Sequence, residues 1–187
     1  MNNIVLAIVG VAGTGKSALT ALMSAVYSFT PVYFGGCVLE EVKRRGLDLS
    51  SENERSIREE LRAERGMHVI AELSHPSIQA ALTDGFNVVI DGLYSRSEYE
   101  YLKARLTNEF FLLAVHSAKR LRYERLANRD HRSLSALEVD TRDSSELKNL
   151  EKCEPIVLAD YHIVNDGTHN ELSKKLDEIM REVIPRD

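Results

Sequence analysis

The stretch that decides the fold is a glycine-rich octapeptide close to the start of the chain. It reads Gly10-Val11-Ala12-Gly13-Thr14-Gly15-Lys16-Ser17. This stretch matches the pattern G-x-x-x-x-G-K-[ST] at every fixed position. Glycine lets the backbone turn sharply, so that successive N–H groups point inward at phosphate oxygens. The octapeptide therefore predicts a loop that binds phosphate groups.

The sequence on either side of this loop supports the same interpretation. The apolar run Ile4–Val9 precedes the loop and is typical of a buried strand. The amphipathic segment Lys16–Tyr27 follows it and predicts a helix whose N-terminal partial positive charge favours phosphate. Lys16 is expected to reach the β- and γ-phosphates of a nucleotide, and Ser17 to hold Mg²⁺. The nucleotide contacts expected in this region are Gly10, Gly13, Thr14, Gly15, Lys16, Ser17 and Ala18.

A second candidate for the metal lies at the end of another apolar run. Asp91 directly follows Phe86–Ile90, and in open α/β sheets ligands bind at the carboxyl ends of the strands. A carboxylate in that place can hold the water shell of Mg²⁺ beside the phosphate loop. The alternative is that Asp91 and Gly92 form an ordinary Asp-Gly turn. We favour the metal-linked role.

Length and composition indicate one domain of ordinary globular type. Of the 187 residues, 43% are hydrophobic and 28% are charged, which excludes disorder as the global state. The net charge of −5 excludes a generally basic surface for nucleic acid. No apolar run reaches the length of a membrane span, and the two cysteines, Cys37 and Cys153, cannot form a metal cage alone. We expect a cytoplasmic protein that binds neither nucleic acid nor membranes.

Short apolar runs alternate with longer helical patterns along the chain. The expected strands are Ile4–Val9, Val32–Phe34, Phe86–Ile90, Phe110–Val115 and Tyr161–Val164. This alternation predicts an α/β fold, with a parallel sheet covered by helices on both faces. The polar segment Glu52–Ala81 is expected to be helical, with one break near Ser74–Pro76, and to lie at the rim of the site. A last helix is expected behind an N-cap at Thr168.

Basic side chains are concentrated in one stretch of this acidic chain. The stretch contains Lys119, Arg120, Arg122, Arg125, Arg129 and Arg132. The last four are spaced by three, four and three residues, which would place them on one face of a helix. Neighbouring like charges repel unless an anion lies among them, and polyphosphate is a natural candidate. We interpret Arg125 and Arg129 as phosphate contacts, and Lys119, Arg120 and Arg122 as side chains that face water.

With these features in view, the chain resembles the P-loop kinases of small metabolites. It is most similar to the dephospho-coenzyme A kinase and nucleoside monophosphate kinase group, especially to uncharacterised archaeal-type relatives. The resemblance covers nearly the whole chain. Besides the phosphate loop, it rests on Lys43-Arg44-Arg45-Gly46, Val89-Ile90-Asp91-Gly92, Glu124-Arg125-Leu126 with Arg129-Asp130, Arg142-Asp143, and Ala159-Asp160-Tyr161-His162-Ile163-Val164-Asn165.

This resemblance implies a three-layer α/β/α P-loop NTPase fold over residues 1–187, with five parallel strands in the order 2-3-1-4-5. It also implies an acceptor-binding arm at about residues 35–82 and a small helical lid at about residues 129–143. In such kinases lid arginines clamp the phosphates of ATP, which implies that role for Arg125, Arg129 and Arg142. The loop at Asn165 would contact the adenine base, and Arg62 would bind the acceptor.

The departures from this family pattern all lie on the acceptor side. Gly36 stands where the archaeal-type relatives have Asp, and Leu39 where they have Arg. Tyr94 stands where they have Arg after the Asp-Gly pair, and Arg96, two residues further on, is the candidate that compensates. Losing an arginine from a phosphate site removes charge-assisted hydrogen bonds of roughly 1.5–3 kcal/mol each. That loss is enough to change the preferred acceptor.

Two hypotheses of different classes follow. The first is an ATP- and Mg²⁺-dependent kinase of a small phosphorylated acceptor, such as dephospho-coenzyme A or a nucleoside monophosphate. In this case Lys16, Asp91, Arg125, Arg129 and Arg142 carry catalysis. The alternative is an ATP-binding regulatory or interaction protein that has lost transfer to an acceptor. A nucleotide hydrolase that acts mechanically on other proteins is a weaker third option.

Overall fold

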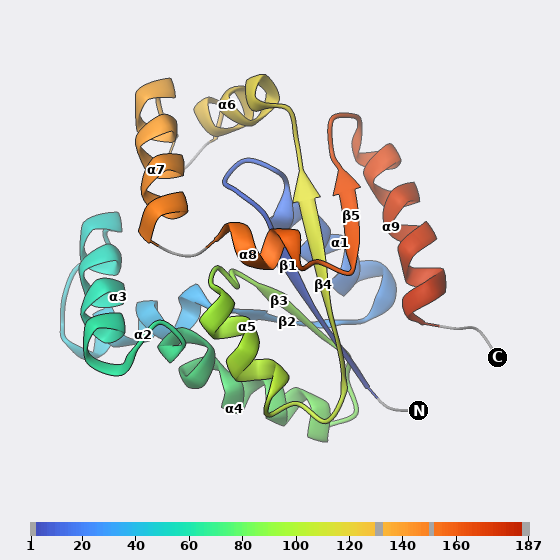
Figure 1. The fold of residues 1–187 in the computed structure, drawn as a ribbon, viewed down its shortest axis with the longest axis horizontal. Coiled ribbons are helices and arrows are strands. Elements are labelled where there is room, and N and C mark those ends of the chain that lie inside the picture. The colour runs from blue at the N-terminus through green and yellow to red at the C-terminus, as the bar shows by residue number, and fades with distance from the viewer. Residues whose placement is uncertain (1–2, 130–132, 150–151, 185–187) are drawn as a thin grey trace.

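Five parallel strands form the centre of the molecule (Figure 1), which is described by a computed structural model over residues 3–129, 133–149 and 152–184. They are β1 (Ile4–Val9), β2 (Thr30–Tyr33), β3 (Val88–Asp91), β4 (Glu109–His116) and β5 (Tyr161–Val164). Their order in the sheet is β2-β3-β1-β4-β5. This confirms the predicted sheet and its order. The carboxyl ends of β1 and β3 therefore meet, and Ile8 lies opposite Asp91.

The central strand β1 has no exposed residue. Its alternate side chains enter two separate apolar cores, one on each face of the sheet. Val5, Ala7 and Val9 face one core, and Ile4, Leu6 and Ile8 face the other. This is why the strand reads as a continuous apolar run and not as an alternating one. The phosphate loop follows directly from this most buried strand.

Helices cover both faces of the sheet, and further helices extend from its carboxyl edge (Figure 1). The first helices along the chain are α1 (Lys16–Tyr27), α2 (Gly35–Arg44), α3 (Ser51–Arg65), α4 (Val69–Thr83) and α5 (Arg96–Lys103). They are followed by α6 (Lys119–Ala127), α7 (Ala136–Asn149), α8 (Cys153–Val157) and α9 (His169–Val183). Helices α1 and α9 pack on one face, and α2, α4 and α5 pack on the other.

The expectation for the polar segment Glu52–Ala81 is wrong in two respects. The break lies between α3 and α4 at Gly66, where φ is 91°, and not near Ser74–Pro76. Pro76 lies inside α4. Helix α4 also packs on the sheet and not at the rim, because Ile70 and Ile78 are buried in the core. Their helical spacing outweighs the helix-breaking tendency of one proline.

The predicted shared face of four arginines is also wrong. Helix α6 ends at Ala127 and is capped by Asn128. Arg129 therefore follows the helix and does not continue its face, and Arg132 lies outside the described residues. The polar residues after Ala127 cannot bury an apolar stripe, so nothing in the segment favours another helical turn.

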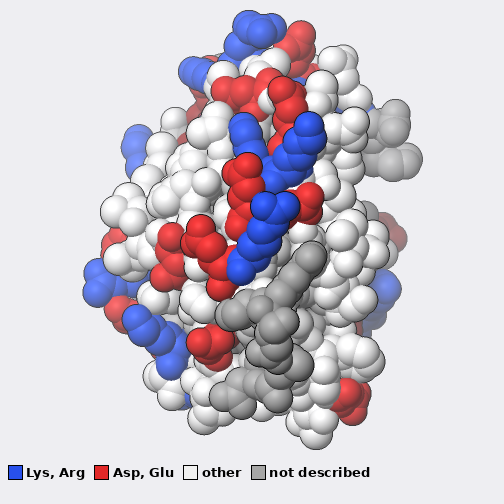
Figure 2. All heavy atoms as spheres, turned by 90° about the vertical axis from the view of Figure 1, so that its right-hand side faces the viewer, with Lys and Arg blue, Asp and Glu red and all other residues white. Residues whose placement is uncertain are grey.

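The last helix, α9, confirms its predicted start and its buried stripe. Thr168 and Glu171 form a reciprocal capping box at its N-terminus. Leu172, Leu176 and Met180 are buried against the sheet. Figure 2 shows that Lys and Arg side chains alternate with Asp and Glu on this side of the molecule. In the described ranges, none of the helices is long and apolar enough to span a membrane.

The buried stripe of α9 generates a stability prediction. Leu176 is 1% exposed, so Leu176→Ala is expected to lower the free energy of unfolding by about 2–5 kcal/mol through lost burial and a residual cavity. Leu137→Ala is the control, because Leu137 is 77% exposed and should change stability by no more than about 0.5 kcal/mol. Urea denaturation measures both. Equal losses in the two variants would contradict the packing described for α9.

Candidate active site

The phosphate loop has a backbone shape that requires glycine. Gly13 and Gly15 have φ angles of 81° and 99°, in the region that other residues rarely adopt. A Cβ on Gly15 would lie 2.2 Å from Nδ2 of Asn165. That amide in turn donates a hydrogen bond to the carbonyl of Thr14 at 2.9 Å. The loop at the end of β5 therefore holds the phosphate loop from one side, and both segments of the predicted nucleotide site are in contact.

Lys16 lies at the centre of this loop. Its Nζ donates to the carbonyl oxygens of Gly10 at 2.9 Å and Val11 at 3.0 Å. Burial, together with the positive charge of Lys152, lowers the pKa of the Lys16 ammonium from 10.5 to about 7. A lysine in this environment gains from an added anion, because the anion favours its charged form.

Ser17 and Asp91 meet beside the loop, as the sequence predicts. The Ser17 hydroxyl donates to Oδ2 of Asp91 at 3.4 Å. Burial raises the pKa of the Asp91 carboxyl, and Lys16 opposes this shift. A hydroxyl and a carboxylate are the oxygen ligands that Mg²⁺ prefers. The two side chains therefore fit a magnesium site on the edge of the phosphate loop.

Arg122 corrects the expectation that its side chain faces water. It is buried, and its Nε donates to the carbonyl of Ala12 at 2.7 Å. Its Nη2 lies 2.7 Å from both carboxylate oxygens of Asp143. The guanidinium thus joins α6, the phosphate loop and α7. The expectation that Lys119 and Arg120 face water agrees with the structure, because both are exposed and paired with acidic neighbours.

Apolar contacts complete the seat of α7 on the phosphate loop. Val139 of α7, Leu126 of α6 and Ala12 of the loop form a small buried cluster. Helix α7 therefore rests on the loop through Val139 and through the ion pair of Asp143 with Arg122. The sequence reasoning missed this seat, although the Asp beside Arg142 was a signal for it.

Arg125 and Arg129, which we interpreted together, lie in different environments. Arg125 donates to Oγ of Ser117 at 3.0 Å and to the carbonyl of Asn165 at 2.9 Å. It also lines an open hollow of about 420 Å³ on α6. Arg129 is exposed beyond the end of α6. Arg125 is thus held against the loop after β5, where the base of a nucleotide is expected.

A charged cluster joins α7 and α8, in which Glu146 and Lys152 are buried and Arg142 is exposed. Nε of Arg142 donates to Glu146 at 2.8 Å, and the same carboxylate forms an ion pair with Lys152. The Lys152 ammonium lies 4.2 Å from the centre of the Tyr94 ring. Burial raises the pKa of the Tyr94 phenol, with Glu146 adding to the shift. Arg142 is engaged by Glu146, and its role as a phosphate clamp stays a prediction.

Glu146 and Lys152 were missed by the sequence reasoning. Glu146 lies four residues after Arg142, a spacing that indicates a helical ion pair. No pattern in the sequence marks Lys152, because its neighbours in the site come from other elements. Its charge and burial only become apparent in the folded chain.

The expected acceptor-binding arginines are both engaged by carboxylates. Arg62 is buried, and its Nη2 lies 3.3 Å from Glu98. The same carboxylate accepts hydrogen bonds from the backbone N–H groups of Tyr94 and Ser95. Nε of Arg62 has no hydrogen-bond partner among the described residues. Arg96 is exposed and paired with Glu100 and Glu154, so its acceptor role stays a prediction.

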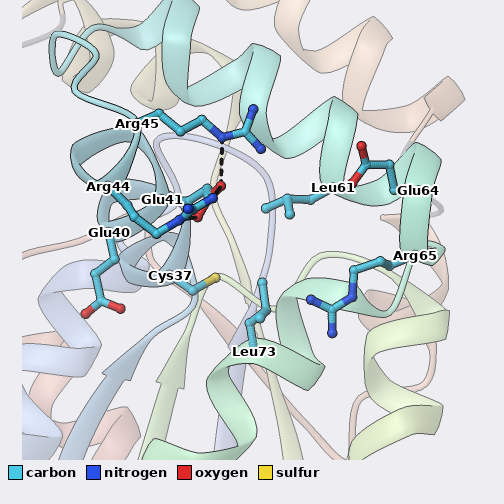
Figure 3. A pocket seen from close by; sticks show the side chains of 9 residues that line it. All are labelled: Cys37, Glu40, Glu41, Arg44, Arg45, Leu61, Glu64, Arg65 and Leu73. Atoms are coloured by element: carbon cyan, nitrogen blue, oxygen red, sulfur yellow. Dashed lines mark hydrogen bonds and ion pairs between the residues drawn. The ribbon is translucent and has the colours of Figure 1, made fainter.

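The arm contains a separate cavity of about 440 Å³ between α2, α3 and α4 (Figure 3). Figure 3 shows the Cys37 thiol and the side chains of Leu61 and Leu73 pointing into it. Its charged rim consists of Glu40, Glu41, Arg44, Arg45, Glu64 and Arg65. The rim arginines form ion pairs with Glu41, Glu60 and Glu72. An anion entering this cavity would have to displace a carboxylate.

Comparison with known proteins places this geometry in context. The sequence model of a family described as "AAA domain" matches residues 6–143. A "UPF0200 protein" of Thermococcus sibiricus is 32% identical over 180 residues, which cover 94% of this chain and 93% of that protein. A "UPF0200 protein" of Aeropyrum pernix is 33% identical over 172 residues, with 91% and 89% covered.

Solved structures of small-molecule kinases share the fold. A shikimate kinase from Aquifex aeolicus superposes with a TM-score of 0.55 at 20% identity, covering 97% of this chain and 99% of that one. A gluconokinase from Sinorhizobium meliloti superposes with a TM-score of 0.58 at 14% identity, covering 97% and 95%. At this level of identity the likeness establishes the fold and not the substrate.

The environment of Arg122 generates a second stability prediction. Arg122→Met is expected to lower the free energy of unfolding by about 3 kcal/mol, because Asp143 would lose its partner in a largely buried place. Arg120→Met is the matched control, since Arg120 forms an exposed pair with Glu124 at 3.1 Å and such pairs contribute less than about 1 kcal/mol. Chemical denaturation compares the two. A small, equal effect in both variants would contradict the contacts described for Arg122.

The pKa of Lys16 generates a prediction about pH. The ammonium has a pKa of about 7 in the free protein, and bound phosphates should raise it. Binding therefore takes up a proton above pH 7, and the affinity for a Mg²⁺–nucleoside triphosphate should fall about tenfold per pH unit there. Below pH 7 the lysine is already charged, so the affinity should level off.

Isothermal titration calorimetry between pH 6.5 and 8.5 measures this dependence. Lys16→Arg is the control, because arginine stays charged over the whole range. Its affinity should be nearly independent of pH. A wild-type profile as flat as that of Lys16→Arg would show that Lys16 does not titrate on binding.

Proposed function

We propose that this protein is a phosphotransferase. The chain belongs to the UPF0200 family and to the AAA domain family. An AAA-type P-loop domain implies nucleotide binding. The fold is shared with kinases of small molecules. The proposed reaction is the transfer of the γ-phosphoryl group of ATP to a small phosphorylated acceptor, such as dephospho-coenzyme A or a nucleoside monophosphate.

The observation that carries this proposal is the meeting of a complete phosphate loop with basic side chains from α7 and α8. Transfer of a phosphoryl group requires little covalent chemistry from the protein, because positioning and charge neutralisation supply most of the catalysis. Lys16, Arg142 and Lys152 all act electrostatically within one site. A site whose only task was to bind a diphosphate would not need cations beyond the loop itself.

Each part of the site has a place in this reaction. The backbone N–H groups of the loop and Lys16 would hold the β- and γ-phosphates. Ser17 and Asp91 would hold Mg²⁺, which when bound neutralises charge on the phosphate oxygens. Arg125 and the Asn165 loop would position the base. An acceptor oxygen would form the new bond to the γ-phosphorus as the bond to the leaving ADP oxygen breaks. This atom is a hydroxyl oxygen in dephospho-coenzyme A, whose proton would pass to water, and a phosphate oxygen in a nucleoside monophosphate, where no proton need leave.

The acceptor side supports a change of specificity relative to the family pattern. A Cβ built on Gly36 meets no atom within 4 Å, so the place where relatives have Asp is open space. Tyr94, at the position for which the family resemblance implies Arg, is engaged by Lys152. The open space at Gly36 leaves room for an acceptor of different shape.

One observation favours the alternative of a nucleotide-binding regulatory protein. Arg62 and Arg96, the arginines nearest in the sequence pattern to an acceptor role, are both paired with carboxylates. In that case ATP would bind and no acceptor would be phosphorylated. The kinase proposal requires only that the cations at the phosphate loop be available, so it remains the better supported of the two.

Phosphoryl transfer from ATP·Mg²⁺ across a panel of acceptors tests the proposal. The panel contains dephospho-coenzyme A, ribo- and deoxynucleoside monophosphates and small phosphorylated metabolites, with chromatographic detection of products. Arg142→Ala is expected to lower kcat about 10²–10³-fold, the usual effect of removing one charge donor from a transition state. Lys16→Ala should abolish the product.

Arg120→Ala is the matched control for Arg142→Ala, because Arg120 is exposed and pairs with Glu124. Its rate should equal that of the wild type. No product from any acceptor, with ATP binding demonstrated by calorimetry, would contradict the kinase proposal and favour the regulatory alternative.

A further inference from the structure

Lys152 has an unusual environment for a lysine. It is the N-cap residue of α8 and is 2% exposed. Lysine is almost never fully buried unless its charge is paired. Here one side of the ammonium faces Glu146 of α7, and the ring of Tyr94 lies 4.2 Å away. Helix α8 contacts α5 and β4, and Tyr94 belongs to the segment that follows the carboxyl end of β3.

Two sets of contacts place Lys152 beside the phosphate loop. Tyr94, under its ammonium, lies three residues after Asp91, which accepts from Ser17. Glu146, its ion-pair partner, lies three residues after Asp143, which Arg122 joins to the loop.

The charges around Lys16 do not balance. The charged side chains that act on the Lys16 ammonium are accordingly Lys152, Arg142, Asp91 and Glu146. Together with Lys16 they make three cations and two carboxylates. Two lysine ammonium groups that repel each other in a buried place would both be stabilised by an anion between them. The terminal phosphate of a nucleotide on this loop would be such an anion.

We propose that Lys152, whose ammonium lies over the Tyr94 ring, is a second phosphate-binding lysine. Together with Lys16 it binds the terminal phosphate of the triphosphate. This inference rests on the nucleotide-binding part of the proposed function. It also gives Tyr94 a role. Its ring lies under a cation that comes from another element.

Glu146 restrains this cation in the free protein. The same carboxylate binds Lys152 and Arg142, so its single charge is shared between two cations. When a triphosphate binds, its terminal phosphate competes with Glu146 for Lys152. Glu146 therefore opposes binding of the terminal phosphate, whereas Lys152 promotes it.

This opposition allows a test in which two halves of one ion pair have opposite effects. Lys152→Met should weaken the binding of a non-hydrolysable ATP analogue about tenfold to a hundredfold, the usual effect of losing one charge-assisted contact. It should change ADP affinity less than about threefold, because ADP lacks the terminal phosphate. Glu146→Gln should strengthen binding of the analogue. Isothermal titration calorimetry with Mg²⁺ present measures all of these.

Two further variants control the comparison. Lys103→Met removes a lysine that lies 5.3 Å from the centre of the Tyr99 ring at the far end of α5, and it should bind both nucleotides like the wild type. Lys152→Arg keeps the charge, so it should bind the analogue far better than Lys152→Met. Thermal unfolding of each variant establishes that it is folded at the temperature of the titration.

The outcomes separate this inference from the function on which it rests. If Lys152→Met and Glu146→Gln both weaken analogue binding, or if Lys152→Met weakens ADP and analogue equally, then Lys152 only holds α7 and α8 together and the inference is wrong. If Lys152→Met is unfolded, the sign for Glu146→Gln and the binding by Lys152→Arg decide. If the wild-type protein binds neither nucleotide, the proposed function itself fails.

Discussion

The buried guanidinium of Arg122 is the constraint on which the arrangement of the site depends. It donates to the carbonyl of Ala12 in the phosphate loop and to both carboxylate oxygens of Asp143 in α7. Removing a charge from water costs several kcal/mol unless its partners are well placed, so few positions of α7 can satisfy it. The same ion pair fixes the position of α7, from which Arg142 pairs with Glu146.

The site has an excess of positive charge that a bound anion would stabilise. Burial holds the pKa of Lys16 far below its ordinary value, and the neighbouring charges are only partly compensated by Asp91 and Glu146. Such an arrangement has its dipoles and cations in place before the ligand arrives, which is the condition for strong electrostatic catalysis in a site that excludes water. Burying these charges costs free energy. The packing of the sheet, in which β1 is buried on both faces, offsets that cost.

The predicted acceptor side depends on another ion pair. Arg62 and Glu98 form a buried pair that also accepts the N–H groups at the start of α5. This pair links α3 of the arm to the end of β3, so the arm is positioned by the same carboxyl edge of the sheet that holds the phosphate loop. Kinases with this fold act on unlike acceptors, which is expected when the fold supplies the donor site and local side chains supply specificity.

Local patterns in the sequence were sufficient to predict the phosphate loop and the elements beside it. The phosphate loop, the strand before it, the helix after it, and Asp91 at the end of β3 are all local patterns, because a strand–loop–helix unit is specified by neighbours in the chain. The start of α9 was predictable for the same reason, since a capping box involves residues three apart.

The environments of Arg122 and Lys152 near the phosphate loop depend on the tertiary structure. Arg122 looks like one surface arginine among several until Ala12 and Asp143, 110 and 21 residues away in the chain, are placed around it. Lys152 has no local pattern at all, and its role comes from Tyr94 and Glu146 on other helices and loops. Burial and electrostatic environment depend on which distant segments meet, and that is a property of the packed chain and not of any one stretch of it.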